Sequence, residues 1–313
     1  MHLFSKAPNF DFVGKRKFAL MISVALFVGS IASLSVNKLN LGLDFKGGIL
    51  LEIGYSKVVK VEDIRSTLSN NGFKDAVVQF IGPTERFVTV RISGKDNTSK
   101  AEISNRVVEI LETNSSEEIE IRRREFVGAK VGEELRERGG FAMLIAMAGI
   151  LVYVMLRFEW RFAVGAITAL VHDVFITLGF FSVFKWNFDL TVLAALLAVI
   201  GYSLNDTIVV YDRIRENFRK IRKGTTIDVT NTSLNQTLSR TIITSLTTLV
   251  VLLAMFFFGG ETIRPFAIAL IVGVLVGTYS SIYVASSMVL ALKIDRSHLL
   301  PVTKEEKQQE DHP

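Results

Sequence analysis

The sequence predicts an α-helical membrane protein with six transmembrane helices and one small α+β domain inserted between the first two helices. Three observations predict this fold class. Hydrophobic residues make up 49% of the 313-residue chain, and the mean hydropathy is +0.37. The charged residues, 21% of the chain, are clustered, so that long neutral runs remain between them. One long polar segment follows the first neutral run and shows strand-like and helix-like patterns.

Six neutral runs are long enough to cross a bilayer, because about 20 apolar residues form a helix as long as the hydrocarbon layer is thick. The predicted spans are 18–36, 139–156, 162–184, 190–211, 241–258 and 266–292. Lys15, Arg16 and Lys17 resemble the basic start of a signal peptide, but the run that follows is longer than a signal core. We therefore expect the segment 1–17 to precede an uncleaved membrane anchor.

The distribution of Lys and Arg predicts the orientation, because cytoplasmic loops are enriched in both residues. The loop 212–240 holds seven of them and 157–161 holds two, whereas 185–189 and 259–265 hold one each. Both termini, including the tail 293–313, are therefore predicted to be cytoplasmic. The segment 37–138 is predicted to lie on the opposite side of the membrane.

The outer segment, 37–138, has a pattern of its own. Strand-like runs occur at 49–55, 76–81, 87–92 and 119–126, and helix-like runs at 61–71 and 99–113. The order βαββαβ predicts a small ferredoxin-like domain. Glycines occur at both of its attachment points, in LGLDFKGG (41–48) and at Gly139 and Gly140. They either act as hinges or form fixed tight turns.

Asn205 and Asp206 interrupt the fourth predicted span, in the stretch SLNDTIVVYDRIREN. A carboxylate at membrane depth costs about 2.5–3.5 kcal/mol, so Asp206 must face other helices or water. Two interpretations stay open. Asp206 is either a group that changes its protonation state during function or a structural hydrogen-bonding carboxylate.

Three more ionisable residues lie within or at the start of predicted spans. Arg240 opens the next span and is either its partner or an arginine whose guanidinium reaches the membrane surface. His172 and Asp173 lie together near the middle of the third span. They either join a proton relay or hold neighbouring helices together.

Few features of the sequence indicate an enzyme. The chain has no cysteine, which excludes disulfides, thiol nucleophiles and cysteine-ligated metals, and its four histidines are scattered. The motifs of intramembrane aspartyl proteases, rhomboid proteases and phosphate-binding loops are absent. Its net charge of +5 comes from basic residues beside hydrophobic runs, which does not indicate nucleic-acid binding. We expect neither an enzyme nor a cofactor.

Four stretches carry a family resemblance. They are LGLDFKGG (41–48), GYSLNDTIVVYDRIREN (201–217), SLNQTLSRTIITSLTTL (233–249) and GGETIRPFAIALIVGVLVGTYSSIYV (259–284). Together they resemble the SecF family of protein-export membrane proteins, which belongs to the RND superfamily. Lys46 departs from the family, where a small residue is more usual. The outer segment of about one hundred residues favours this family over SecD, whose outer domain is much larger.

The resemblance implies a function and a set of partners. SecF proteins pair with SecD into a twelve-span unit in the bacterial inner membrane. This unit assists the SecYEG channel, with SecA and YajC as indirect partners and unfolded polypeptide as the cargo. The proton gradient drives it without a cofactor. Two alternatives stay open: an assembly factor that transports no protons, and half of a small-molecule RND exporter.

The resemblance also assigns residues. Asp206 and Arg240 match the intramembrane Asp and Arg of the family, and we extend the predicted proton pathway to three further residues, Asn205, His172 and Asp173. The motif after the first span contributes four residues with a structural role, Asp44, Phe45, Gly47 and Gly48.

Overall fold

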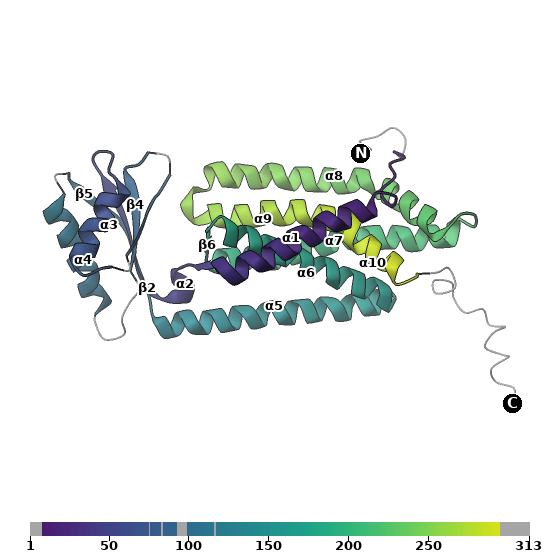
Figure 1. Ribbon diagram of the computed structural model, residues 1–313, viewed down its shortest axis with the longest axis horizontal. Helices are drawn as coiled ribbons and strands as arrows, with labels where there is room; N and C mark the ends of the chain where they lie inside the picture. The colour runs from purple at the N-terminus through teal and green to yellow at the C-terminus, as the bar shows by residue number, and fades with distance from the viewer. Residues whose placement is uncertain (1–7, 75, 83, 93–98, 116, 295–313) are drawn as a thin grey trace, which may run out of the picture.

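The computed structural model describes residues 8–294 except 75, 83, 93–98 and 116. Almost all of the predicted tail 293–313 therefore lies outside the described residues. A long helical bundle and a small α+β domain at one end of it make up the molecule (Figure 1). The chain enters the small domain from the first helix of the bundle and returns through the next long helix.

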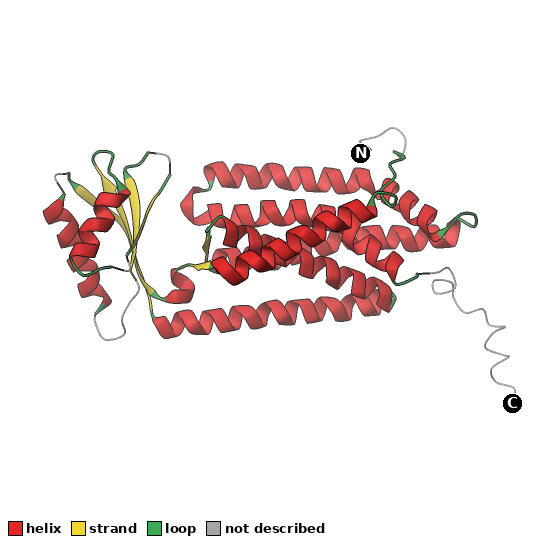
Figure 2. Ribbon diagram, in the orientation of Figure 1, coloured by secondary structure: helices red, strands yellow, loops and turns green. Residues whose placement is uncertain are grey.

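Six helical segments of the described chain are long and apolar enough to cross a membrane. They are α1 (Arg16–Asn37), α5 (Ala129–Arg157), α6 (Trp160–Val183), α7 (Leu190–Lys220), α8 (Thr226–Phe258) and a last segment made of α9 (Gly260–Ser280), the π-helical η1 (Ser281–Ala285) and α10 (Ser286–Ala291). They run side by side along the long axis of the molecule (Figure 2). The predicted fold class is confirmed. Helices α6 and α7 are the most buried and α5 and α8 the least.

Helices α7 and α8 extend well beyond the predicted spans. The predicted loop 212–240 is wrong, because all of it except a short connection is helical. Glu216 pairs with Lys220 one turn later (2.5 Å), which supports the helix past its apolar part. Thr225 and Asp228 then form a reciprocal capping box that starts α8. Charged residues end an apolar run without ending a helix.

Helix α5 begins at Ala129, far before the predicted span 139–156. Its extramembrane turns carry an ion pair between Glu134 and Arg138, one helical turn apart. Gly139 and Gly140 consequently lie inside a continuous helix. The expectation of a hinge or a tight turn at these two glycines is wrong.

The small domain has the predicted ferredoxin-like order. It contains β2 (Gly48–Tyr55), α3 (Val61–Asn70), β3 (Val77–Phe80), β4 (Phe87–Ile92), α4 (Lys100–Asn114) and β5 (Ile119–Val127). The four strands form an antiparallel sheet in the order β3-β4-β2-β5. Both helices cover one face of this sheet (Figure 1), where Leu51 and Val90 are fully buried with Leu68 and Val107 of the helices.

A short joint connects the small domain to the bundle. Its parts are β1 (Asn40–Leu41), α2 (Leu43–Lys46) and β6 (Asn187–Phe188), and β1 pairs in parallel with β6. Gly47 and Gly48 follow with φ angles of 67° and 133°, a backbone region that side chains rarely tolerate. This conformation turns the chain from α2 into the first strand of the domain. Both glycines of the motif are therefore explained by backbone geometry.

Helix α5 packs against this joint at Gly132. A Cβ atom at this position would stand 3.0 Å from the backbone of Phe45 and of Gly47. These are backbone atoms, so they cannot turn away as a side chain would. The two attachments of the small domain therefore touch each other.

We predict that Gly132→Ala destabilises the protein by about 1–3 kcal/mol, because the extra methyl group pushes α2 away from α5. Gly149→Ala in the same helix is the control, since nothing lies within 4 Å of that position. Thermal unfolding of both purified variants measures the difference. Equal melting temperatures would contradict the close contact.

Candidate functional site

The motif at the joint attaches to the N-terminus of α7. The Asp44 carboxylate accepts a hydrogen bond from the backbone N–H of Leu190 (3.0 Å), and Asp189 accepts one from Val192 (3.0 Å). Both carboxylates stand where the helix dipole favours negative charge. Asp44 therefore connects the start of the outer domain to the helix that carries Asp206.

Phe45 fixes the same joint through apolar contacts. Its ring stacks on that of Phe188, with the ring centroids 5.7 Å apart. Both rings belong to a buried cluster with Phe181 and residues at the start of α7. The four motif residues, Asp44, Phe45, Gly47 and Gly48, thus lie together and shape the junction between domain and bundle.

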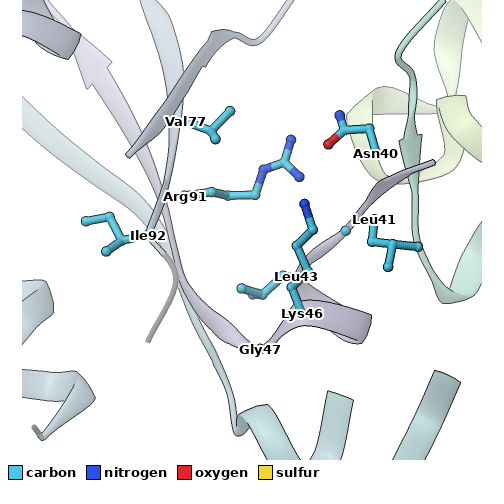
Figure 3. A pocket seen from close by; sticks show the side chains of 9 residues that line it. Asn40, Leu41, Leu43, Lys46, Gly47, Val77, Arg91 and Ile92 are labelled. Carbon is cyan, nitrogen blue, oxygen red and sulfur yellow. The ribbon is translucent and has the colours of Figure 1, made fainter. Parts of the chain in front are cut away.

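Two cations face one another across this junction. Lys46 from α2 and Arg91 from β4 reach into a small cleft that also borders Asn40 (Figure 3). The Arg91 guanidinium donates a hydrogen bond to the side chain of Asn187 (2.6 Å) and therefore links the outer domain to β6. Burial lowers the pKa of Arg91, and the Asp189 carboxylate acts in the opposite direction.

Asp206 is buried among α7, α8 and η1. Its side chain is 8% exposed. One carboxylate oxygen accepts a hydrogen bond from the hydroxyl of Thr241 (2.6 Å), and the other accepts one from Ser281. Both oxygens are thereby satisfied by neutral hydroxyl groups from two other helices.

Asp173 lies in a second buried cluster. It is fully buried, and one oxygen accepts hydrogen bonds from Ser203 (2.6 Å) and Ser280 (2.7 Å). The other oxygen lies 2.9 Å from Nδ1 of His172. The predicted pair of His172 and Asp173 is thus a direct contact, and it joins α6 to α7 and α9.

Adjacent serines connect the two carboxylates. Ser280 donates to Asp173 and the next residue, Ser281, donates to Asp206. Ser203 and Asp206 are likewise close neighbours on α7. The sequence interpretation missed these serines. Their only signal is the pair SS in TYSSIYV, and serines are common in transmembrane helices because they allow close packing.

A π-helical segment begins at Ser281. Such segments interrupt the regular helical hydrogen bonds and occur frequently at functional sites. The hydroxyl of Tyr211, a fully buried residue of α7, donates to the carbonyl oxygen of Ala285 at the other end of this segment (3.3 Å). Helix α7 therefore contacts both ends of η1, through Asp206 and through Tyr211.

Arg240 and Asn205 lie at the edge of this site. Both side chains are exposed, Arg240 on α8 and Asn205 on α7. Arg240 directly precedes Thr241, and its charge acts on Asp206, but the described ion pairs do not include these two residues. The structure thus brings Asp206 together with Thr241 and Ser281, and leaves Arg240 and Asn205 on a free polar surface.

Close helix packing positions the site. Cβ atoms at Gly273 and Gly277 of α9 would stand 2.1 Å from the side chain of Val199 and 3.0 Å from that of Ser203. The two glycines form a GxxxG pattern, which is typical of close helix packing. It brings α9 against α7, so that Ser280 and Ser281 reach the carboxylates.

The described residues around Asp206 and Asp173 form no set of ligands for a metal ion. In the part of the chain that the structure describes, no three His, Asp or Glu side chains are grouped to hold a metal ion. The partners of both carboxylates are hydroxyl groups and one imidazole. Such partners can exchange and reorient protons, because each hydroxyl can donate as well as accept.

Two protein families match parts of the chain. Residues 107–295 match the family described as protein export membrane protein SecD/SecF, C-terminal, and residues 32–57 match the SecD/SecF GG motif. Protein translocase subunit SecF of Vibrio alginolyticus is 52% identical over 91% of this chain and 90% of its own length. The SecF of Escherichia coli O157:H7 is 43% identical over 97% of this chain and 94% of its own length.

Solved structures of SecDF also resemble this chain. SecDF of Thermus thermophilus, described as a translocon-associated membrane protein, is 37% identical, with a TM-score of 0.84 over 93% of this chain. SecDF in a super-membrane-facing form is 37% identical, with a TM-score of 0.70 over 98% of this chain. The present chain spans 40% of the length of each of these SecDF chains.

We predict that Ser280→Ala destabilises the bundle by about 1–3 kcal/mol, because the buried Asp173 loses one hydrogen-bond donor. Thr247→Val is the control, since its exposed hydroxyl bonds only to carbonyls of its own helix. Thermal unfolding in lipid nanodiscs compares the two variants. A smaller effect for Ser280→Ala than for Thr247→Val would contradict the assigned role.

Proposed function

The chain belongs to the SecF family of protein translocase subunits, and from this premise we propose that it couples the proton-motive force to polypeptide export. It acts as the SecF half of a SecDF-type complex in the bacterial inner membrane, with both termini in the cytoplasm. The complex assists the SecYEG channel and SecA in moving unfolded polypeptide, and YajC acts indirectly. The observation that carries this proposal is the Asp206 carboxylate, buried and bonded to hydroxyls of two other helices.

Protonation of Asp206 changes which hydrogen bonds are possible. An ionised carboxylate only accepts, so it suits the two hydroxyls of Thr241 and Ser281 that donate to it. A protonated carboxyl donates from one oxygen, so one of these hydroxyls has to accept instead and direct its own proton to another acceptor. Proton binding at Asp206 thus favours a different set of hydrogen bonds between α7 and α8 or η1.

The available energy is sufficient for such a change. One charge that crosses the membrane potential supplies about 2.3 kcal/mol per 100 mV. A conformational equilibrium of a few kcal/mol can be shifted by this amount. Arg240 is placed to assist, because its approach to Asp206 favours the ionised carboxylate and its withdrawal favours the protonated one. His172 and Asp173 extend the proposed pathway on the other side of the serine pair.

The exposed polar surface of α7 and α8 supports the proposed SecD partner. Asn205 and Arg240 are exposed at the depth of apolar helices, and such groups are costly in contact with lipid. A second helical half that covers them would remove this cost. The SecDF chains that resemble this one are longer by more than such a half.

The joint supports movement of the outer domain. It contains Gly47 and Gly48, and Arg91 bonds across it to Asn187. The chain also matches two SecDF forms with different TM-scores, 0.84 and 0.70. In the proposed cycle, breakage of the bond between Arg91 and Asn187 releases the domain from the bundle.

A structural role for the buried carboxylates is the second candidate. It is favoured by the complete hydrogen bonding of Asp206 and Asp173, which suits permanent helix contacts as well as proton exchange. In that case the complex assembles around these groups without proton transport. The two candidates differ in what the loss of a charge does to assembly and to export.

We predict that Asp206→Asn assembles normally with the SecD-like partner but loses export driven by a pH gradient, because the amide cannot exchange the proton. Asp212→Asn on the same helix is the control, since Asp212 is an exposed partner of Arg157 and should retain export. Arg240→Lys should retain part of the activity, because the charge stays while the guanidinium is lost.

Complex yield and export into inverted membrane vesicles are measured on the same preparations. Full yield with full proton-driven export of Asp206→Asn would exclude the carrier role. A low yield with normal export per complex would instead support the structural role.

We further predict that locking the outer domain to β6 stops export. Arg91→Cys with Asn187→Cys places thiols on both sides of the joint, and the chain has no cysteine of its own. A bis-maleimide reagent with a cleavable disulfide should stop export and permit it again after reduction. Each single-cysteine variant is the control. Normal export after complete cross-linking would disprove the required movement.

A further inference from the structure

The cleft at the junction between the outer domain and the bundle has two cations in its wall. Lys46 extends from α2 and Arg91 from β4, and their charged ends point toward each other across the cleft (Figure 3). Like charges that face one another repel, and an anion between them relieves the repulsion. The described residues that line the cleft include no acidic side chain. The cleft is therefore complementary to an anion.

The charge of Lys46 is not compensated within the part of the chain that the structure describes. Its side chain is exposed, and it takes part in no ion pair or side-chain hydrogen bond among these residues. An ammonium group offers three hydrogen-bond donors. All three are therefore open to a ligand in the cleft.

The junction holds Arg91 in a fixed direction. Its guanidinium donates hydrogen bonds to the side chains of Asn187 (2.6 Å) and Gln79 (2.9 Å), which are both neutral. The Asp189 carboxylate acts on Arg91, but its Oδ1 atom already accepts hydrogen bonds from Thr191 and from the first turn of α7. A guanidinium has five N–H donors. Arg91 therefore retains donors for a further ligand.

The size of the cleft restricts the anion. Its volume of about 50 Å³ is far below the range of about 300–1,000 Å³ that is common for pockets enclosing whole small molecules. A single group with several acceptor oxygens fits this space. Phosphate is such a group, because arginine binds it through paired hydrogen bonds and lysine through its point charge.

The cleft lies at the depth of phospholipid headgroups. Helix α1, the first apolar span, ends just before β1, and α7 begins just after β6. Strand β1 contributes Asn40 to the cleft wall and pairs with β6. Trp186 stacks on Phe184 immediately before β6, with the ring centroids 4.8 Å apart. Because aromatic residues are enriched at membrane interfaces, lipid phosphate groups are expected at the level of the cleft.

We propose that the cleft between Lys46 and Arg91 binds a phosphate group, which comes from an anionic phospholipid or from free phosphate. The phosphate oxygens accept hydrogen bonds from both cations and thereby connect α2 of the joint with β4 of the outer domain. This connection adds to the bond between Arg91 and Asn187 and holds the domain against the bundle. Binding does not depend on the proposed proton coupling and is measured separately from export.

The test uses the full chain purified in dodecyl maltoside, a detergent without phosphate. Equilibrium dialysis measures the binding of radioactive inorganic phosphate, and native mass spectrometry counts the lipids retained after addition of phosphatidylglycerol or phosphatidylcholine. We expect saturable binding of one phosphate group per chain. Preferential retention of phosphatidylglycerol that inorganic phosphate reverses identifies a lipid as the source. Saturable binding of inorganic phosphate without a lipid preference identifies the free ion.

Two variants and a control locate the site. Lys46→Ala should weaken binding about tenfold, because one of the two charged donors is lost. Since the Lys46 side chain is exposed, this variant should remain folded. Lys46→Arg should retain binding, because the positive charge stays. Lys38→Ala is the control, since it removes an exposed lysine near the same junction that does not line the cleft.

Three results would overturn the proposal. One is that the unmodified protein shows neither saturable binding of inorganic phosphate nor a preference for phosphatidylglycerol. Another is an affinity of Lys46→Ala equal to that of the unmodified protein or to that of Lys38→Ala. The third is competition by acetate as strong as competition by phosphate, which would assign the cleft to a carboxylate group such as an acidic side chain of a bound polypeptide.

Discussion

The helical bundle depends on the hydrogen bonds that satisfy two carboxylates inside it. Asp173 and Asp206 would each destabilise a membrane-spanning bundle if their oxygens met only hydrocarbon. Hydroxyl groups from neighbouring helices prevent this, and adjacent serines at the end of α9 and the start of η1 serve both groups. Because these donors come from different helices, the carboxylates determine how α6, α7, α8 and α9 must be placed. The close packing at Gly273 brings α9 near enough to α7 for the serines to reach the carboxylates.

The outer domain is attached to this bundle through the helix that carries Asp206. Asp44 bonds to the first turn of α7, and Phe45 packs beside it. In the proposed cycle, a movement of α7 would reach the joint through these direct contacts. Gly132 limits how far the small domain can move, because it lets α5 pack directly against the backbone of Phe45 and Gly47. The coupling proposed for this protein thus has a continuous structural path.

The sequence predicted those features of the structure that have a strong residue pattern. Long apolar runs gave six spans, alternating residues gave the βαββαβ order, and a carboxylate within an apolar run identified Asp206. The C-terminal part of α7 and the N-terminal part of α8 lie outside the predicted spans, because charged and polar residues end the apolar run there, while an ion pair in α7 and the capping box of α8 extend the helices. The pairing of β1 with β6 has only two residues per strand and leaves no pattern. Ser280 and Ser281 were missed because nothing distinguishes a serine that meets a carboxylate from one that permits close packing.

The π-helical segment has a rotational consequence. One extra residue in a helical turn offsets everything after it by about 100° from the direction that a regular α-helix would give. Ser287 and Met288 of α10 therefore line a cavity beside His172, while Ser281, about two turns earlier, faces the Asp206 carboxylate. A return to regular α-helical geometry would turn these two faces relative to each other and would take the Ala285 carbonyl from Tyr211. The hydrogen bonds that α7 makes through Asp206 and Tyr211 thus hold the last helix at the angle that includes the π-helical turn.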